Sequence, residues 1–498
     1  MRILNSALLA ILASAASALF GGCSSPSTAQ TMSYPASLLD FLTRADEADS
    51  PISLEGELPL IAIPMVEEAQ SLCEGVLSSG ACPVIVPLTK DASALSSMAA
   101  SWDGAIVPDG WVKEEDPFSV LFYRALCDRN VPTMGSSPLC REINEGLRRY
   151  NDFAVDVEEL VRRASTYHHA KKLMDRIFTI DTHGDLPSEY RNGYRLGIRT
   201  TNQISLQKME EGHLQSHVLV SFQYQGPLDK DAHRRAFAKC DGMIDQILED
   251  VKANEDLCEI AYTPEDALRI KGKGKKPFFI GIENGYGLGD DLAAIQHFAE
   301  RGVVYVTLCH MRDNLICHTS SRNSADTSAG LTPFGVQVVH ELNRRGIIVD
   351  VSHTSSATFW DCIRESSAPI ICSHSGASAI FRHNRNINDS QLRALAQKGG
   401  VIQVYMTPDF MGRDLSKVSL DDMMDHILHC IKVAGIDHVG IGCDFDGGGG
   451  GIGINGDNDM INITVRLLEA GLSEEDIEKI WGGNFLRVLS KVQAMAGR

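Results

Sequence analysis

The larger part of this chain is organised around one run, Phe178-Thr179-Ile180-Asp181-Thr182-His183-Gly184-Asp185-Leu186-Pro187. Its first four residues, Phe178–Asp181, include aromatic and β-branched side chains, which suit a covered β-strand. His183 and Asp185 follow one residue apart, so both side chains lie on the same face of an extended backbone. An imidazole and a carboxylate at a strand end can hold a divalent metal ion. Because this pair is common by chance, its meaning depends on the sequence that follows.

Seven further stretches of the same kind follow, and helical patterns such as Asp291–Arg301, Phe334–Arg345 and Leu420–Val433 separate most of them. Eight β/α units predict an α/β fold, a (β/α)₈ TIM-like barrel with insertions. A doubly wound open sheet is the alternative. The eight candidate strands are Phe178–Asp181, His217–Phe222, Phe278–Ile282, Val303–Leu308, Ile347–Val351, Pro369–Cys372, Val401–Tyr405 and His438–Gly442.

Chemically capable side chains cluster at the carboxyl ends of these predicted strands. Six of the eight strands contribute, and barrel enzymes build their active sites on that face. The barrel is therefore preferred over the open sheet. The residues in question are His183, Asp185, Glu283, His310, His353, His374 and Asp444.

In order and spacing, these runs resemble the membrane (renal) dipeptidase family of zinc peptidases, which have an amidohydrolase-like barrel. The likeness extends from about Phe178 to Val488 and includes the closing run Gly483-Asn484-Phe485-Leu486-Arg487-Val488. The resemblance implies an enzyme, a metallo-dipeptidase, with two Zn²⁺ ions as cofactors. By position, His183 and Asp185 would bind one zinc, His353 and His374 the other, and Glu283 would bridge them.

The same resemblance implies how a dipeptide would be hydrolysed. A metal-bridging hydroxide would attack the peptide carbonyl, Asp444 would carry the proton to the leaving amine, and His310 would bind substrate and stabilise the oxyanion. Arg385 would bind the free C-terminal carboxylate of the substrate, since its fork suits that group. A longer peptide would leave this guanidinium unpaired, which favours dipeptides.

Two departures from the family pattern bear on the substrate. Asn284 stands where the family usually has Gly after the bridging Glu, and Met311–Thr327 has its own character. Which side chains the dipeptide carries therefore stays open. Two other functions are also alternatives. One is metal-dependent hydrolysis of another amide, such as a lactam or cyclic ureide, and the other is a non-catalytic surface binding lipoprotein.

An alternating pattern of strands and helices also fills residues 56–151 and predicts a small parallel α/β (flavodoxin-like) domain. Asp103-Gly104-Ala105-Ile106-Val107-Pro108-Asp109-Gly110 resembles a strand of the class I glutamine amidotransferase and γ-glutamyl hydrolase domains. Ser137 stands where that family has its nucleophilic Cys. We expect a degenerate domain without amidase chemistry, acting in packing or docking. The barrel domain, with a linking helix at its start, is expected over 152–498.

The N-terminus reads as an export signal. Met1-Arg2 precedes an apolar stretch, and small residues lead to Cys23 and a Ser/Pro/Thr run. This resembles a bacterial lipoprotein signal, with a signal peptide over 1–22, lipidation of Cys23 and a tether over 23–55. We therefore expect an exported lipoprotein of the bacterial cell envelope (periplasm or outer surface), held to the membrane by a lipid anchor only. A simple secretory peptide is the alternative.

Composition narrows the set of partners. The chain has 498 residues, 44% of them hydrophobic, and a formal net charge of −19. This charge argues against nucleic acid, since phosphate binding needs clustered Lys and Arg. Small dipeptides are the expected partners, and a homodimer is compatible with the sequence. Twelve cysteines besides Cys23 are widely spread, so their pairing cannot be deduced.

Overall fold

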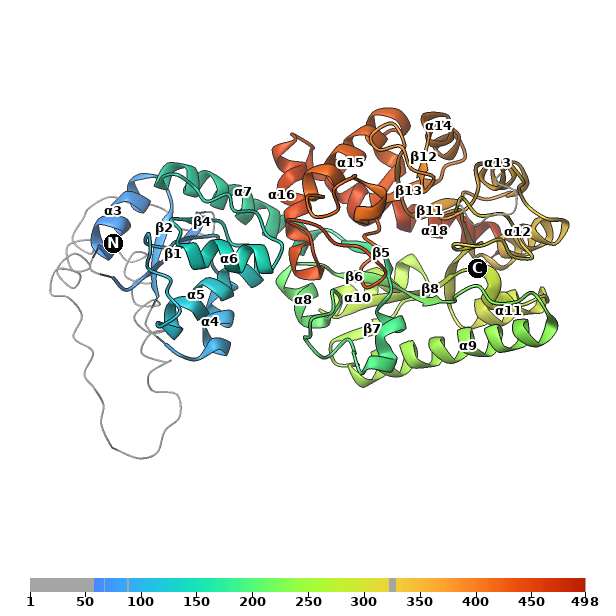
Figure 1. Ribbon diagram of the computed structural model, residues 1–498, viewed down its shortest axis with the longest axis horizontal. Helices are drawn as coiled ribbons and strands as arrows, with labels where there is room; N and C mark the ends of the chain where they lie inside the picture. Colours follow the sequence, from blue (N-terminus) through green and yellow to red (C-terminus); the bar gives the residue numbers. More distant parts are fainter. Residues whose placement is uncertain (1–57, 67, 87–88, 322–327, 498) are drawn as a thin grey trace. The chain divides into compact units, whose positions relative to one another are not determined.

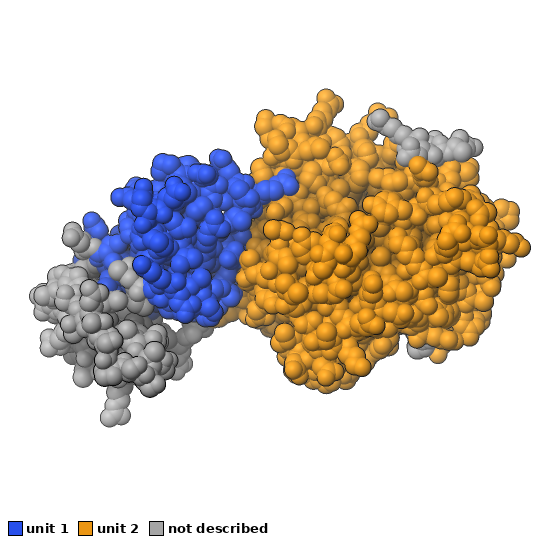
Figure 2. All heavy atoms as spheres, turned by 60° about the horizontal axis from the view of Figure 1, so that its bottom comes forward, with its two compact units in different colours: residues 1–171 blue, residues 172–498 orange. Residues whose placement is uncertain are grey.

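The structure is a computed structural model that describes residues 58–66, 68–86, 89–321 and 328–497. The expected signal peptide, Cys23 and the tether lie outside the described residues. The chain divides after Lys171 into two compact units (Figure 2). Within the described residues, no helix is long and apolar enough to cross a membrane, and all twelve cysteines are free.

The first unit contains a four-stranded parallel sheet with the strand order β2-β1-β3-β4 (Figure 1). This order is that of a flavodoxin-like doubly wound sheet, so the predicted small parallel α/β domain is confirmed. Its elements are β1 (Leu60–Pro64), α3 (Ala69–Ser78), β2 (Cys82–Val86), α4 (Ala92–Ala99), β3 (Gly104–Ile106), α5 (Pro117–Asp128), β4 (Thr133–Met134) and α6 (Pro138–Gly146).

Ser137, which aligns with the nucleophile in the amidotransferase resemblance, acts here as a helix cap. It is 4% exposed and precedes α6, and its Oγ accepts a hydrogen bond from the backbone N–H of Cys140 at 3.2 Å. A buried hydroxyl in this role satisfies an end of the helix.

The long helix α7 (Val157–Arg176) packs mainly within the first unit. Leu160 and Ala164 belong to the same apolar cluster as Ile61 of β1, and Lys171 Nζ donates to Asp103 Oδ1 at 2.9 Å. Part of its apolar face therefore belongs to the core of the first unit. The expected start of the barrel domain at residue 152, with this helix as the link, stays a prediction.

The second unit is built on eight parallel strands in the order β14-β13-β11-β10-β9-β8-β6-β5. A parallel bridge between Gly184 and Phe445, next to the first and last strands, closes this sheet into a barrel. The predicted TIM-like barrel is confirmed. Its strands are β5 (Ile180–Gly184), β6 (Ser216–Phe222), β8 (Lys276–Glu283), β9 (Val303–Thr307), β10 (Ile348–Asp350), β11 (Ile371–Ala377), β13 (Val401–Val404) and β14 (Val439–Ile441).

Helices surround this barrel, and two short strands extend the sheet (Figure 1). β7 (Cys258–Ile260) pairs with β8, and β12 (Asn386–Ile387) pairs with β11. The main helices are α9 (Lys230–Ala253), α10 (Pro264–Gly272), α11 (Ala293–Glu300), α12 (Pro333–Arg345), α13 (Ser356–Glu365), α14 (Asp389–Gln397), α15 (Leu420–Ala434), α16 (Ile461–Glu469) and α18 (Asn484–Met495).

The apolar core fills the amino end of the barrel. Phe178, just before β5, clusters with Phe279 of β8 and with Phe485 and Val488 of α18. The rings of Phe279 and Phe485 lie 6.0 Å apart edge to face, a favourable aromatic geometry. With this end closed by α18, the polar strand ends gather at the opposite, carboxyl end.

Candidate metal centre

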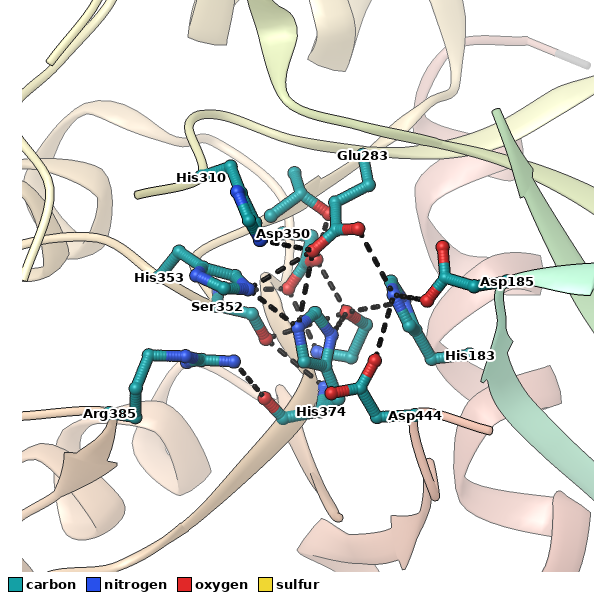
Figure 3. A network of polar contacts seen from close by, with 12 residues as sticks. His183, Asp185, Glu283, His310, Asp350, Ser352, His353, His374, Arg385 and Asp444 are labelled. Atoms are coloured by element: carbon teal, nitrogen blue, oxygen red, sulfur yellow. Dashed lines mark hydrogen bonds and ion pairs between the residues drawn. The ribbon is translucent and has the colours of Figure 1, made fainter. Parts of the chain in front are cut away.

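Six of the predicted site residues converge at the carboxyl end of the barrel (Figure 3). They come from five strands or the loops that follow them, and each is at most 8% exposed. Strands far apart in sequence thus deliver their side chains to one buried point, as expected for a barrel enzyme. The six are His183, Asp185, Glu283, His353, His374 and Asp444.

Glu283 lies at the centre of this cluster. Its Oε1 is 3.0 Å from Nε2 of His353 and 3.4 Å from Nε2 of His374, whereas its Oε2 is 3.6 Å from Nε2 of His183. The two oxygens of one carboxylate therefore face two different groups of imidazoles. This is the arrangement expected of a carboxylate that bridges two ions.

A second group of donors surrounds His183. Its Nε2 lies 3.6 Å from Asp185 Oδ2 and 4.0 Å from Asp444 Oδ1. In the described part of the chain, three overlapping sets of donor atoms each fall within 4.8 Å. They are His183, Glu283 and His374; Glu283, His310 and His353; and His183, Asp185 and Asp444.

These donors fit divalent metal ions. His183 Nε2 and Asp185 Oδ1 are fully buried and make no hydrogen bond with any other described residue. Leaving such groups unpaired costs free energy of about 1–3 kcal/mol each, and a cation between them would satisfy both. Imidazole nitrogens mixed with carboxylate oxygens form a donor set that binds zinc and other divalent metal ions.

The electrostatics of the cluster also call for positive charge. Burial, reinforced by the charge of Glu283, raises the pKa of Asp185 well above its usual range. Burial and Glu283 likewise raise the pKa of Asp444 to about 6. For His183, burial lowers the pKa, but the three surrounding carboxylates outweigh it and raise the pKa to about 10. Without a metal ion, a proton on His183 compensates part of the negative charge.

The other pair of imidazoles behaves differently. Burial holds the pKa of both His353 and His374 well below the usual value, and the positive charge of Arg385 lowers both further. Both rings are therefore neutral, the form in which imidazole coordinates a metal. Their Nε2 atoms lie 2.9 Å apart.

Hydrogen bonds behind the cluster orient two of the rings. Nδ1 of His183 lies 2.8 Å from the hydroxyl of Tyr305, and Nδ1 of His374 lies 2.8 Å from Oγ of Ser373. That hydroxyl of Ser373 donates to Asp350 Oδ2 at 2.6 Å. Each ring thus uses Nδ1 behind the site and directs Nε2 into it, as metal-binding histidines commonly do.

Sequence reasoning gave no role to Tyr305, Ser373 or Asp350. The position of Tyr305 within a predicted barrel strand could have indicated its role, because a tyrosine that faces the barrel interior needs a polar partner for its hydroxyl. For Asp350, the sequence indicated only a position near the end of a strand. Its contact to Ser373 depends on the register of β10 against β11, whereas its Oδ1 also accepts from the backbone N–H of Ser352, two residues further along the chain.

The backbone is irregular where it presents these side chains. His353 has φ of 66° and Asp444 has φ of 64°, in the left-handed region that is uncommon for residues other than glycine. The ladders of β5 and β11 change register between Asp181 and Gly184 and between Cys372 and Ser375. Such bulges re-aim side chains next to active sites.

Asn284 also has positive φ, at 74°. Its Oδ1 accepts from the backbone N–H of Tyr286 at 3.1 Å, and its Nδ2 donates to the carbonyl oxygen of Gln223 at 2.9 Å. Asparagine tolerates this conformation better than most residues. The backbone at this position therefore accepts Asn284 in place of the Gly that is usual in the family.

His310 and Arg385 lie at the edge of the cluster. Nε2 of His310 is 4.0 Å from Glu283 Oε1, and its ring packs edge-on against Phe222. Arg385 is 4% exposed and donates to the carbonyl oxygen of His374 at 3.0 Å. Its guanidinium packs against Phe410, which lines the cleft, whereas Arg385 itself is not among the lining residues.

A cleft of about 640 Å³ opens onto the cluster. Asp185, Glu283, His353 and Asp444 lie at its base, and Phe222 and His310 form part of its wall. This volume suits a small molecule rather than a polypeptide. The site thus combines a buried constellation of metal donors with a cleft for a small substrate on a (β/α)₈ barrel. These features define a metal-dependent hydrolase.

Comparison with known proteins identifies the family. Residues 167–498 match the model of the membrane dipeptidase family (peptidase family M19). The chain belongs to this family of metallo-dipeptidases.

Two relatives carry dipeptidase names. Dipeptidase tcpJ of Claviceps purpurea (strain 20.1) is 36% identical over 254 residues, which are 51% of this chain and 60% of the relative. The uncharacterized dipeptidase C965.12 of Schizosaccharomyces pombe is 31% identical over 352 residues, which are 66% of this chain and 83% of that protein. This chain therefore spans less than two thirds of the first of these relatives.

Solved structures share the barrel. The probable dipeptidase PvdM from Pseudomonas aeruginosa superposes with a TM-score of 0.64 at 28% identity, over 66% of this chain and 99% of that one. The dipeptidase AC, a metallo peptidase, superposes with a TM-score of 0.58 at 24% identity, over 64% of this chain and 98% of that one. This second likeness bears on the fold alone.

Proposed function

We propose that the protein is a dinuclear zinc dipeptidase that hydrolyses dipeptides with a free C-terminal carboxylate. The observation that carries this proposal is the position of Glu283, whose two oxygens face His353 and His374 on one side and His183 on the other. His183 and Asp185 would hold one Zn²⁺, His353 and His374 the second, and Glu283 both. The dipeptidase names of the two relatives support the same reaction class.

When bound, the two ions would supply a metal-bridging hydroxide near neutral pH and polarise the peptide carbonyl. The side chains around the ions would carry out the other steps. They must bind the dipeptide, move one proton and stabilise the charge that develops on the carbonyl oxygen.

Asp444 is the proposed proton carrier. Thr407 Oγ1 donates to its Oδ2 at 3.0 Å, which fixes the carboxylate, while Oδ1 faces the His183 side of the cluster. A carboxylate with a raised pKa can accept a proton and then release it to the leaving amine. The αL backbone at Asp444 aims this side chain into the cleft.

His310 is the proposed oxyanion donor. Its ring lines the cleft beside Glu283. Burial, together with the positive charge of Arg385, lowers its pKa although Glu283 opposes this shift. A neutral imidazole N–H at this place can donate a hydrogen bond to the carbonyl oxygen as negative charge develops there.

Arg385 is the proposed reader of the C-terminal carboxylate. Its buried guanidinium donates one hydrogen bond to the carbonyl oxygen of His374, and its Nε has no hydrogen-bond partner among the described residues. It therefore retains donors for a substrate carboxylate. Loss of activity on a dipeptide whose C-terminus is amidated is the expected sign of this role.

We also propose that the protein is exported and anchored by acylation of Cys23, as the small residues before this cysteine suggest. Metabolic labelling with a palmitate analogue tests this proposal. Label that is present in the native chain and absent after Cys23→Ser would support it, and equal labelling of both would refute it.

Zinc per chain, measured together with hydrolysis of a dipeptide panel, tests the main proposal. Two zinc ions per chain and metal-dependent cleavage of Leu-Ala but not of Leu-Ala amide are expected. Equal cleavage of both would favour the alternative, an enzyme acting on another amide such as a lactam or cyclic ureide. Absence of any cleavage by the zinc-loaded protein would favour a binding lipoprotein.

A further inference from the structure

Two basic side chains line the cleft on the side of β5 and β6. Arg191 belongs to the 3₁₀ segment η1 (Leu186–Asn192), which follows β5, and Lys239 belongs to α9, which follows β6. Both are exposed. Neither makes an ion pair or hydrogen bond with another residue of the described ranges. Both charges are thus free to act on whatever enters the cleft.

The strand order places these two cations opposite Arg385. In the ring of eight strands, β6 and β11 are four positions apart, and Arg385 immediately precedes β12, which pairs with β11. In Figure 3, Arg385 and Asp185 lie on opposite sides of the donor cluster. A dipeptide whose carboxylate meets Arg385, with its scissile bond over the cluster, directs its first residue toward β5 and β6.

The cleft wall on this side carries aromatic and apolar side chains beside the two cations. Phe222 at the end of β6 packs edge-on against Tyr224, with ring centroids 4.6 Å apart, and Tyr224 is 71% exposed. Met243 of α9 lines the cleft beside them. Such a surface accepts the methylene groups of a side chain, and the nearby cations favour a negative charge at its tip.

Other acidic residues line the same cleft. Asp446 already accepts from the backbone N–H of Gln203 at 2.9 Å, and Glu189 accepts from Asn192 Nδ2 at 2.5 Å. Asp409 follows β13, three strands from β6 around the ring, and forms no ion pair with either cation among the described residues. The charges of Arg191 and Lys239 are therefore not neutralised by direct pairing with them.

We propose that Arg191 and Lys239 are specificity-determining residues that select dipeptides with an acidic first residue, glutamate above all. This inference rests on the proposed dipeptidase function and adds a substrate class to it. Glutamate combines two methylene groups for the aromatic wall with a carboxylate for the cations. Glutamine has the same shape without the charge.

The test compares kcat/KM for Glu-Ala, Gln-Ala, Lys-Ala and Leu-Ala on the zinc-loaded full chain. We expect Glu-Ala to exceed Gln-Ala by about five- to twentyfold at low salt, since each exposed ion pair contributes about two- to fivefold. The ratio should fall as salt is added. It should approach one in the double variant Arg191→Gln/Lys239→Gln and should favour Lys-Ala in Lys239→Glu.

Lys491→Gln is the matched control, because Lys491 is an exposed lysine of α18 at the amino end of the barrel and should leave the ratio unchanged. Zinc content and the thermal midpoint of each variant establish that it is folded. If no dipeptide is cleaved by the native protein, the proposed function fails. If Leu-Ala is cleaved but Glu-Ala is no better than Gln-Ala, or the ratio survives in the double variant, only this inference fails.

Discussion

The hydroxyl of Tyr305 lies 2.8 Å from Nδ1 of His183 and donates its own hydrogen bond to the carbonyl oxygen of Thr182 at 3.0 Å. Because that proton is committed to Thr182, the Tyr305 oxygen can only accept from His183. When His183 is neutral, the form in which imidazole binds a metal ion, its proton is therefore on Nδ1, and the lone pair of Nε2 faces Asp185 and Glu283. A tyrosine in the barrel wall thereby sets the tautomer of the ring.

Tyr305→Phe should weaken zinc binding by about 10- to 100-fold, the range for loss of a partner behind a metal ligand. The fold should persist, since the ring is kept. Competition with a chromophoric chelator measures this affinity. Tyr286→Phe is the control, because it removes another tyrosine hydroxyl, bonded to the carbonyl oxygen of Pro227, away from the donors. Equal affinity in both variants would contradict the role of Tyr305.

Asp444→Asn should retain zinc and lower kcat by about 10²- to 10⁴-fold, the usual contribution of general acid–base catalysis. Asparagine keeps the shape of the side chain and tolerates the φ of 64° at this position. Metal analysis and steady-state kinetics on Leu-Ala are the measurements. Asp414→Asn, at an exposed loop position, is the control. Undiminished turnover in Asp444→Asn would rule out the proton-transfer role.

Glu283→Gln should reduce bound zinc to fewer than two ions per chain. The amide offers one oxygen instead of two, so it cannot face both sets of imidazoles as the carboxylate does. Metal analysis after dialysis at fixed free zinc measures the change. A variant that still holds two zinc ions with native affinity would show that the two sites do not share Glu283.

His426 should make the free energy of unfolding depend on pH. Burial lowers its pKa to about 4, and its Nδ1 accepts from the backbone N–H of Ala377 at 2.9 Å. Between pH 6.5 and 4, His426 is protonated in the unfolded chain but stays neutral in the folded chain. Stability is therefore full above pH 6.5 and falls as pH decreases, by about 3 kcal/mol at most.

His426→Asn should reduce this slope by about one proton, because the amide oxygen can accept from Ala377 without titrating. Urea unfolding of both proteins between pH 4.5 and 7, with zinc held constant, gives the two slopes. His438→Asn, at a partly exposed imidazole bonded to the carbonyl oxygen of Gly400, is the control. Parallel slopes for the native protein and His426→Asn would contradict this prediction.

The barrel could be predicted because its strands are short apolar runs, each followed by polar residues. The first and last residues of the strands were harder to predict. β5 covers Ile180–Gly184 rather than Phe178–Asp181, since Phe178 turns into the core at the amino end and the strand continues through His183. β11 reaches Ala377, although Ser373–Ala377 has little of the bulk typical of strands, because pairing with β12 and β13 holds it extended.

The donor residues could be named from the sequence, but their geometry could not. The positive φ of His353 and Asp444 and the register shifts in β5 and β11 arise from tertiary packing, which no local pattern encodes. The contact of Thr407 with Asp444 joins two loops and was likewise hidden. The burial of Arg385 against Phe410 could not be predicted either, because it depends on how two segments distant in sequence pack together.

The seam between the first and last strands of the barrel has a consequence for biosynthesis. The backbone N–H of Asp185 donates to the carbonyl oxygen of Phe445 at 2.8 Å, so the earliest donors of the site are held by a segment near the end of the chain. A nascent or truncated polypeptide that lacks this segment has neither Asp444 nor the bridge that positions Asp185. The complete set of metal donors therefore requires the whole barrel, from β5 to the loop after β14.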